Sequence, residues 1–225
     1  LSIRRQRQMC IRDRADVVPE DRLDAVLTAI DKMDKKYGIQ LCEPAYPHYD
    51  SHVGRMSGML LGLFENGGVY NHCNAFKIMA DCRLGRAEQA LSTLHKMIPD
   101  SKDNPVSITG AEPYLFVNCW CMHPSFFTRI WFGWFTGTSA WALRGFYEGI
   151  CGLRREYGGL RVQPCIPGAW KELTLTRTFR GCRYHIHISN TGSGKPEVTV
   201  DGNRLADTLL PVLNDGQIHE VVVRT

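Results

Sequence analysis

Residues 173–189, LTLTRTFRGCRYHIHIS, carry the pattern that decides the fold of the C-terminal part of this chain. Leu173 and Leu175 alternate with threonine before an Arg-Gly pair, and Ile186 and Ile188 alternate with histidine after it. A period of two is typical of a strand with one buried face, and a short glycine-containing turn joins two such strands. The alternation continues in EVTVDGN at 197–203 and QIHEVVVR at 217–224. The pattern predicts a small antiparallel β-domain over residues 158–225.

Upstream of this domain the period changes to that of a helix. Apolar residues recur at three and four positions in the ranges 21–38, 74–84, 87–97 and 138–150. Gly38 and Gly85 indicate helix ends. Helix pairs joined by long glycine-rich loops favour an α/α toroid over residues 15–157. Because the strands follow the helices without interleaving, the predicted fold class is α+β with two packed modules.

The composition is that of a soluble globular protein, since 44% of the 225 residues are hydrophobic and 22% are charged. No stretch approaches the ~20 apolar residues of a transmembrane helix, so we expect no membrane partner. The formal net charge of +4 lies in residues 1–14, which hold five Arg and one Asp, so we expect no nucleic-acid partner. The string RQRQMCIRDR at 5–14 resembles the conceptual translation of a sequencing adapter. We therefore expect residues 1–14 to be an unstructured artefact outside the fold.

The nine cysteines form no C-x-x-C pair and no zinc-knuckle spacing. Several lie among apolar residues, where a free cysteine behaves as a small buried hydrophobe. We therefore expect reduced thiols, a cytoplasmic location and no metal site. His185 and His187 share the strand face opposite the isoleucines, and without a third ligand this pair indicates solvated histidines rather than zinc.

The stretch FENGGVYNHCN at 64–74 combines an acidic residue, two glycines and a histidine just before a predicted helix. Gly67 and Gly68 permit backbone geometries or a close ligand approach that other residues forbid. Asn71 or His72 then lies at the helix entrance, where free N–H groups and the macrodipole favour an anion. A glycine turn with a capped helix, and with His72 hydrogen-bonded in the core, explains the same pattern.

Two further loops carry candidate chemistry. In WFGWFTGTSAW at 131–141, four aromatic residues precede Thr136 and Gly137 at a helix start, which forms a plausible phosphate cradle. The aromatic residues suit sugar faces, although aromatic residues more often fill a core. In AEPYLFVN at 111–118, Glu112 precedes a proline, and we expect a structural hydrogen bond from it rather than catalysis.

Five motifs in this order resemble the C-terminal part of the inverting disaccharide phosphorylases of glycoside hydrolase family 94. The motifs are ENGGVYNH at 65–72, MADCRLGRAEQAL at 79–91, AEPY at 111–114, WFTGTSAW at 134–141, and REYGGLRVQPCIPGAW at 155–170 followed by TRTFRGCRYHI at 176–186. The resemblance covers residues from about 43 to 190. It implies the last helices of an (α/α)6 barrel over 15–157 and a jelly-roll-like β-layer over 158–225. The chain is then expected to be a C-terminal fragment.

The resemblance also implies an anion site. His72 matches the family histidine that contacts phosphate, and Thr136 and Gly137 match the Thr-Gly pair that contacts the same anion. The catalytic aspartic acid of the family lies upstream of every motif found here, and Asp50 and Asp81 stand in other contexts. The resemblance therefore implies no catalytic residue in this chain, which we expect to be inactive by itself.

Sugar contacts are implied at the other end of the site. Glu65 matches a glutamate of the family's sugar-binding region, and Arg55 and Tyr70 are expected to line the same region. Phe64 stands where family members usually carry Lys or Arg, and Leu61-Gly62 replaces a Pro-Gly pair. Phe64 thereby removes a cation from the acceptor end of the site.

For the intact protein the resemblance implies phosphorolysis of a β-linked glucosyl disaccharide or oligosaccharide, with inversion, to an α-sugar 1-phosphate. This is a glycosyltransferase-type reaction in which a carboxylic acid protonates the departing oxygen while phosphate attacks from the opposite face. Phosphate is the co-substrate, no metal or organic cofactor is required, and a homodimer is expected. Two alternatives remain: a hydrolase that shares the barrel and activates water, and a non-enzymatic carbohydrate-binding remnant.

Overall fold

The computed structural model describes residues 6–7, 18–98, 102, 105–112, 114–125 and 129–225. The chain forms two compact units. The first comprises Leu1–Ala80 and Ser92–Arg144, and the second comprises Asp81–Leu91 and Gly145–Thr225. Within the described ranges, no helix has the length and apolar character needed to span a bilayer.

The helices follow the apolar periodicity of the sequence. The α-helices of the described residues are α2 (Leu23–Met33), α3 (Asn71–Arg83), α4 (Ala87–Met97), α5 (Val106–Thr109) and α6 (Thr138–Arg144). Short 3-10 helices η1 (Glu20–Arg22) and η2 (Gly54–Gly58) accompany them, and a π-helix η3 (Gly145–Ile150) follows α6 directly. The predicted helices at 87–97 and from 138 are confirmed, whereas α3 begins three residues earlier than the apolar pattern indicated.

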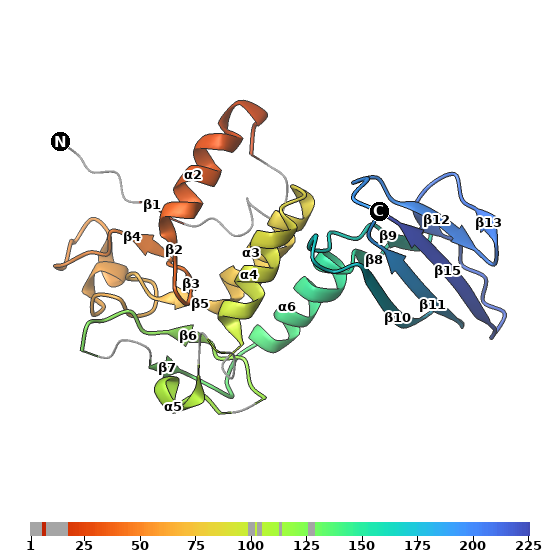
Figure 1. The fold of residues 1–225 in the computed structure, drawn as a ribbon. Coiled ribbons are helices and arrows are strands. Elements are labelled where there is room, and N and C mark those ends of the chain that lie inside the picture. Colours follow the sequence, from red (N-terminus) through yellow and green to blue (C-terminus); the bar gives the residue numbers. More distant parts are fainter. Residues whose placement is uncertain (1–5, 8–17, 99–101, 103–104, 113, 126–128) are drawn as a thin grey trace. The chain divides into compact units, whose positions relative to one another are not determined.

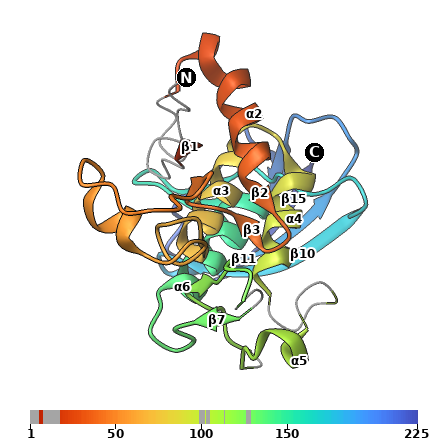
Figure 2. The ribbon, with the colours of Figure 1, turned by 90° about the vertical axis from the view of Figure 1, so that its left-hand side faces the viewer.

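Helix α2 ends before the predicted stop signal. It buries Ile30 and Met33 against Ile39, and it gives way at Asp34 to an extended backbone. Strand β2 (Asp34–Lys35) pairs with β3 (Gly38–Ile39), so Gly38 belongs to a hairpin and not to a helix end. Its φ of +121° is available to glycine at little cost, which explains the residue at that position. Figure 2 shows α2 running directly into this hairpin.

The first unit contains short strands that the sequence reading assigned to loops. Strands β5 (Val69–Tyr70), β6 (Cys119–Trp120) and β7 (Ile130–Trp131) form one antiparallel sheet. The buried rings of Tyr37 and Trp120 stack beside it at 5.2 Å between centroids. A strand of two residues carries no detectable period, so this sheet could not be found from alternation. It matters for function because it joins the loop before α3 to the loop before α6.

Helices α3 and α4 lie side by side, as the yellow segments of Figures 1 and 2 show. The buried Lys77 ammonium of α3 donates a hydrogen bond to the Thr93 hydroxyl of α4 at 2.9 Å. Phe76 of α3 meets Trp141 of α6 edge to face at 4.6 Å between centroids. The hydrogen bond holds α3 against α4, and the ring contact holds α3 against α6.

The first seventeen residues include one described element. Strand β1 (Gln6–Arg7) pairs antiparallel with β4 (Cys42–Glu43). The expectation that residues 1–14 are unstructured is therefore wrong at this pair. Edge pairing uses backbone N–H and C=O groups, so it requires no burial of the arginine charge. The other residues of this segment lie outside the described part of the chain.

The second unit is built on a five-stranded sheet with the order β10-β11-β15-β12-β13. Its strands are β10 (Glu172–Phe179), β11 (Cys182–Ser189), β12 (Glu197–Val200), β13 (Asn203–Arg204) and β15 (Ile218–Arg224). Figure 1 shows these strands in blue tones. The β10–β11 and β12–β13 hairpins confirm the alternation reading. The purely antiparallel prediction is wrong for β11 and β15, which run parallel because residues 190–217 cross over between them.

A second, three-stranded sheet completes this unit. It contains β8 (Leu153–Arg155), β9 (Leu160–Val162) and β14 (Leu209–Leu210) in the order β14-β9-β8. Alternation along β11 places Tyr184, Ile186 and Ile188 in the core. His185 and His187 share the opposite face, as expected, where the Glu220 carboxylate lies 3.3 and 3.5 Å from their rings.

Candidate functional site

His72 lies in the first turn of α3 with its two ring nitrogens in different surroundings. Its Nδ1 atom is 2.5 Å from the Tyr70 hydroxyl, whose ring meets the imidazole edge to face. Its Nε2 atom is buried and has no hydrogen-bond partner among the described residues. Burial lowers the pKa of His72, which favours the neutral ring near pH 7. A buried ring nitrogen without a partner is the place where a ligand would complete the site.

Gly137 lies directly against this free nitrogen. A Cβ atom built on Gly137 would come within 3.1 Å of His72 Nε2, a contact that only a residue without a side chain avoids. The structure therefore brings the ENGGVYNH and WFTGTSAW motifs together, as the anion-site hypothesis requires. Because the motifs are far apart in sequence, the hypothesis would have failed had they lain at different ends of the unit.

The Thr136 side chain hydrogen-bonds Thr138, the first residue of α6. Its hydroxyl accepts the Thr138 backbone N–H at 3.1 Å and lies 2.7 Å from the Thr138 hydroxyl. The Asn118 amide donates to the same Thr136 oxygen at 3.2 Å. Asn118 also hydrogen-bonds Tyr70, which opposes the rise that burial causes in the tyrosine pKa. Asn118 thus connects Thr136 to Tyr70, and Tyr70 connects to His72.

A cavity of about 590 Å³ opens beside this group of side chains. Its lining includes Arg55, Glu65 and Tyr70, the three residues that the family resemblance assigned to sugar binding. The remaining lining residues are Leu41, Phe64, Asn118 and Phe132. The volume lies within the range of small-molecule sites. The sequence reading missed Asn118 and Leu41, each a single loop residue with no local pattern around it.

Two phenylalanines in the cavity wall have unusual backbones. Phe64 has a φ of +45° and Phe132 a φ of +53°, a region that bulky residues rarely adopt. Their rings stack at 5.9 Å between centroids, and Phe64 also meets Trp131 at 5.6 Å. Strained backbone of this kind concentrates at binding sites. Phe64 and Phe132 therefore give this side of the cavity an aromatic wall.

The other carboxylates considered in the sequence are not among the residues that line this cavity. Glu112 is exposed and accepts a hydrogen bond from the Trp134 indole at 2.9 Å, so the expected structural hydrogen bond is confirmed although the residue is not buried. Asp50 accepts the His52 backbone N–H, which lowers the aspartate pKa. Asp81 is buried and pairs with Arg86 at 3.5 Å. Among the described residues, no group of three or more His, Cys, Asp or Glu side chains could hold a metal ion.

The sequence matches two families along most of its length. Residues 6–152 match the catalytic domain of the glycosyl hydrolase 94 superfamily, and residues 153–194 match the C-terminal domain of glycosyl hydrolase family 65. The first match includes every residue of the site described above.

Several relatives of this chain are named as phosphorylases. It is 36% identical over 209 residues to solabiose phosphorylase of Paenibacillus borealis, covering 90% of this chain and 27% of that protein. It is 33% identical to cellobionic acid phosphorylase of Neurospora crassa, and that match covers 90% of this chain and 26% of that protein. It is 28% identical to N,N'-diacetylchitobiose phosphorylase of Vibrio proteolyticus, with 91% of this chain and 26% of that protein covered. The chain spans about a quarter of the length of these relatives. It belongs to the glycosyl hydrolase 94 superfamily and corresponds to the C-terminal part of its catalytic domain with the β-domain that follows.

Proposed function

We propose that the whole protein containing this chain is an inverting glycoside phosphorylase. In this reaction inorganic phosphate cleaves a β-linked disaccharide or oligosaccharide and releases an α-sugar 1-phosphate. The observation that carries the proposal is the buried, unpartnered Nε2 atom of His72 facing Gly137. A hydrolase activates water and needs no such anion cradle, whereas a phosphorylase must hold an anion at the reacting carbon.

His72, Thr136 and Gly137 hold the phosphate in this proposal. In this proposal the Tyr70 hydroxyl donates its hydrogen bond to His72 Nδ1. The neutral imidazole then carries its proton on Nε2, and this N–H group donates a hydrogen bond to a phosphate oxygen. Phosphate is already an anion, so the protein needs to supply placement and charge compensation rather than a strong base.

The sugar occupies the cavity next to the phosphate. Glu65 and Arg55 are exposed at its wall and offer an acceptor and a fork of donors for sugar hydroxyls. Phe64 and Phe132 give flat apolar surface for a pyranose face. With Phe64 at the position where the resemblance implies a cation, Arg55 is the one positively charged side chain among the described residues that line this cavity.

The proton donor is assigned to another part of the whole protein. Of the described residues that line the cavity, Glu65 is the one carboxylate, and its motif places it with the sugar rather than with the departing oxygen. The expected product is an inverted sugar phosphate, because phosphate attacks the face opposite the departing group. We expect the 225-residue chain alone to show little or no turnover.

The test is the phosphate dependence of disaccharide cleavage by the whole protein. A phosphorylase releases an α-sugar 1-phosphate in proportion to added phosphate, and the His72→Ala variant raises the KM for phosphate while the fold is retained. The matched control is His185→Ala, because His185 lies on the solvated face of β11. Cleavage to two free sugars without phosphate would show a hydrolase, and binding of sugar without cleavage would show a carbohydrate-binding protein.

A further inference from the structure

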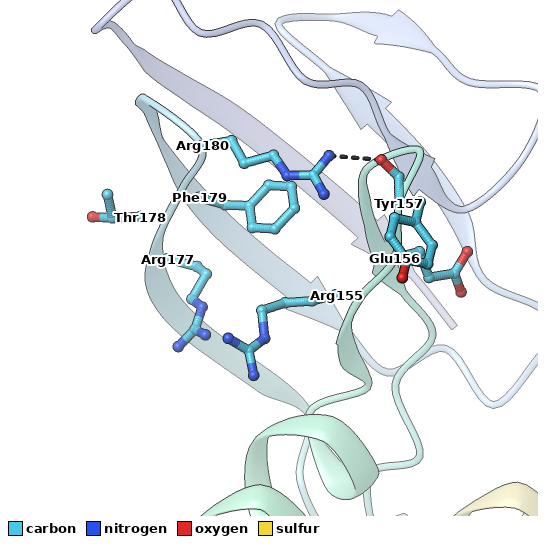
Figure 3. Close-up of a pocket in the computed structure, with 7 residues that line it drawn as sticks. All are labelled: Arg155, Glu156, Tyr157, Arg177, Thr178, Phe179 and Arg180. Atoms are coloured by element: carbon cyan, nitrogen blue, oxygen red, sulfur yellow. Dashed lines mark hydrogen bonds between the residues drawn. The ribbon is translucent and has the colours of Figure 1, made fainter.

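A second cavity, of about 620 Å³, lies wholly within the second unit. It opens between the turn that joins β8 to β9 and the turn that joins β10 to β11. Its lining residues are Arg155, Glu156, Tyr157, Arg177, Thr178, Phe179 and Arg180. Figure 3 shows the side chains of Arg155 and Arg177 both reaching into this space, with the Phe179 ring above them. The cavity contains none of the residues of the phosphorylase site.

Arg177 occupies a position where the strand pattern calls for an apolar residue. Along β10, Leu173, Leu175, Arg177 and Phe179 share the covered face, while the threonines between them are exposed. An arginine on that face interrupts the apolar stripe and places a charge beside the core. Charged residues at covered positions normally have a partner, because removing an unpaired charge from water is costly.

Neither the half-buried Arg177 nor the exposed Arg155 has such a partner in the part of the chain that the structure describes. Among the described residues, the guanidinium groups of Arg155 and Arg177 form no ion pair or hydrogen bond. The nearest acid in sequence, Glu156, is turned away and engaged with Arg161 at 2.5 Å. Two like charges that reach into one cavity repel each other, and a bound anion would remove this repulsion.

The rest of the lining suits a sugar-sized ligand. Arg180 is held by its hydrogen bond to the Tyr157 carbonyl at 2.6 Å and lies over the Phe179 ring at 5.1 Å. This contact ties the two turns together and keeps a third positive charge at the cavity. Tyr157 is 99% exposed at the rim, where an aromatic face can stack on a pyranose.

Protection of a sheet edge does not explain this arrangement. An inward-facing charge on an edge strand discourages pairing with another chain, and β10 is an edge strand. That role needs one arginine on β10. Arg155, however, comes from β8 in the other sheet and contributes a second charge to the same cavity.

We propose that this cavity binds a sugar that carries an oxyanion, either a carboxylate or a phosphate group. The guanidinium groups of Arg155 and Arg177 bind the anionic group through hydrogen bonds, because planar guanidinium matches the geometry of carboxylate and phosphate oxygens. Tyr157 covers the sugar ring. The site is separate from the proposed catalytic site and does not depend on it.

Isothermal titration calorimetry on the 225-residue chain tests the proposal with glucuronate, glucose 6-phosphate, inorganic phosphate and glucose. One of the two anionic sugars is expected to bind saturably, more tightly than phosphate, and glucose is not. Arg155→Gln and Arg177→Gln should each weaken binding by about tenfold, since each removes one charge-assisted contact. Arg224→Gln is the matched control, because Arg224 is exposed on β15 and does not line the cavity.

The variants also separate this site from the phosphorylase site. His72→Ala should leave the binding unchanged, because His72 belongs to the first unit. Arg155 is exposed at the end of β8, so Arg155→Gln is expected to keep the thermal midpoint and reports on binding even if Arg177→Gln destabilises the sheet. No saturable binding at millimolar anionic sugar, equal binding of inorganic phosphate, or loss of binding in His72→Ala would each overturn the proposal.

Discussion

Replacing Gly137 with Ala places a methyl group against the free nitrogen of His72. The new Cβ would lie 3.1 Å from Nε2, closer than an ordinary van der Waals contact, so it fills the space through which this nitrogen reaches an anion. Gly137 is not among the residues with positive φ, so alanine fits its backbone. The folded state should therefore change in stability by no more than about 1 kcal/mol.

The expected loss is in the use of phosphate. Hydrogen bonds to charged groups contribute about 1.5–3 kcal/mol, so losing the one from His72 lowers kcat/KM for phosphate by roughly tenfold to a hundredfold. The assay is initial-rate kinetics of the whole protein at varied phosphate, alongside thermal unfolding of Gly137→Ala. Gly168→Ala is the matched control, because its added Cβ would meet a side-chain atom of Glu88 at a normal 3.8 Å. A folded Gly137→Ala variant with unchanged phosphate kinetics would refute the reasoning.

Three further changes have defined outcomes. Tyr70→Phe removes the hydroxyl bound to His72 Nδ1, and we expect about tenfold weaker phosphate use, measured as the KM for phosphate. Hydrogen bonds to Asp201 and Asp215 raise the pKa of His219, so this imidazole holds its proton more tightly in the folded chain than in the unfolded chain. The free energy of unfolding should therefore fall as the pH rises from about 6.5 through the raised pKa. In urea unfolding at several pH values, His219→Gln should weaken this dependence of the free energy of unfolding on pH. An unchanged dependence would contradict the assignment of the effect to His219. Gly152→Ala would put Cβ 1.9 Å from the Gln163 carbonyl oxygen at a φ of +70°, and we expect a loss of more than about 3 kcal/mol in the free energy of unfolding.

Periodicity predicted the regular elements of this fold well where they were long enough to repeat. The run from Leu173 to Ser189 forms the β10–β11 hairpin, and the helix at 87–97 ends where its pattern ends. Gly38 was misread because a glycine after a helical stretch looks the same in a hairpin as at a helix end. The parallel pairing of β11 with β15 depends on which strand lies next to which, and no local pattern records that choice.

The candidate site was predictable where its residues lie in motifs. His72 and Gly137 were found because each stands in a glycine-containing stretch before a helix, and the structure brings the two together. Asn118 was missed because its role comes from two hydrogen-bond partners that are distant in sequence. The positive φ values of Phe64 and Phe132 were likewise hidden, since tertiary packing imposes them on residues that do not favour that region.

The most direct measurement of the central claim is a crystal structure of the whole protein with inorganic phosphate bound. The account predicts a phosphate oxygen within hydrogen-bond distance of His72 Nε2, with the same anion contacting the Thr136 hydroxyl and the Gly137 backbone. It also predicts that the Tyr70 hydroxyl stays on His72 Nδ1 rather than on the phosphate. Phosphate bound elsewhere in the catalytic domain, with His72 Nε2 still unpartnered, would contradict the account.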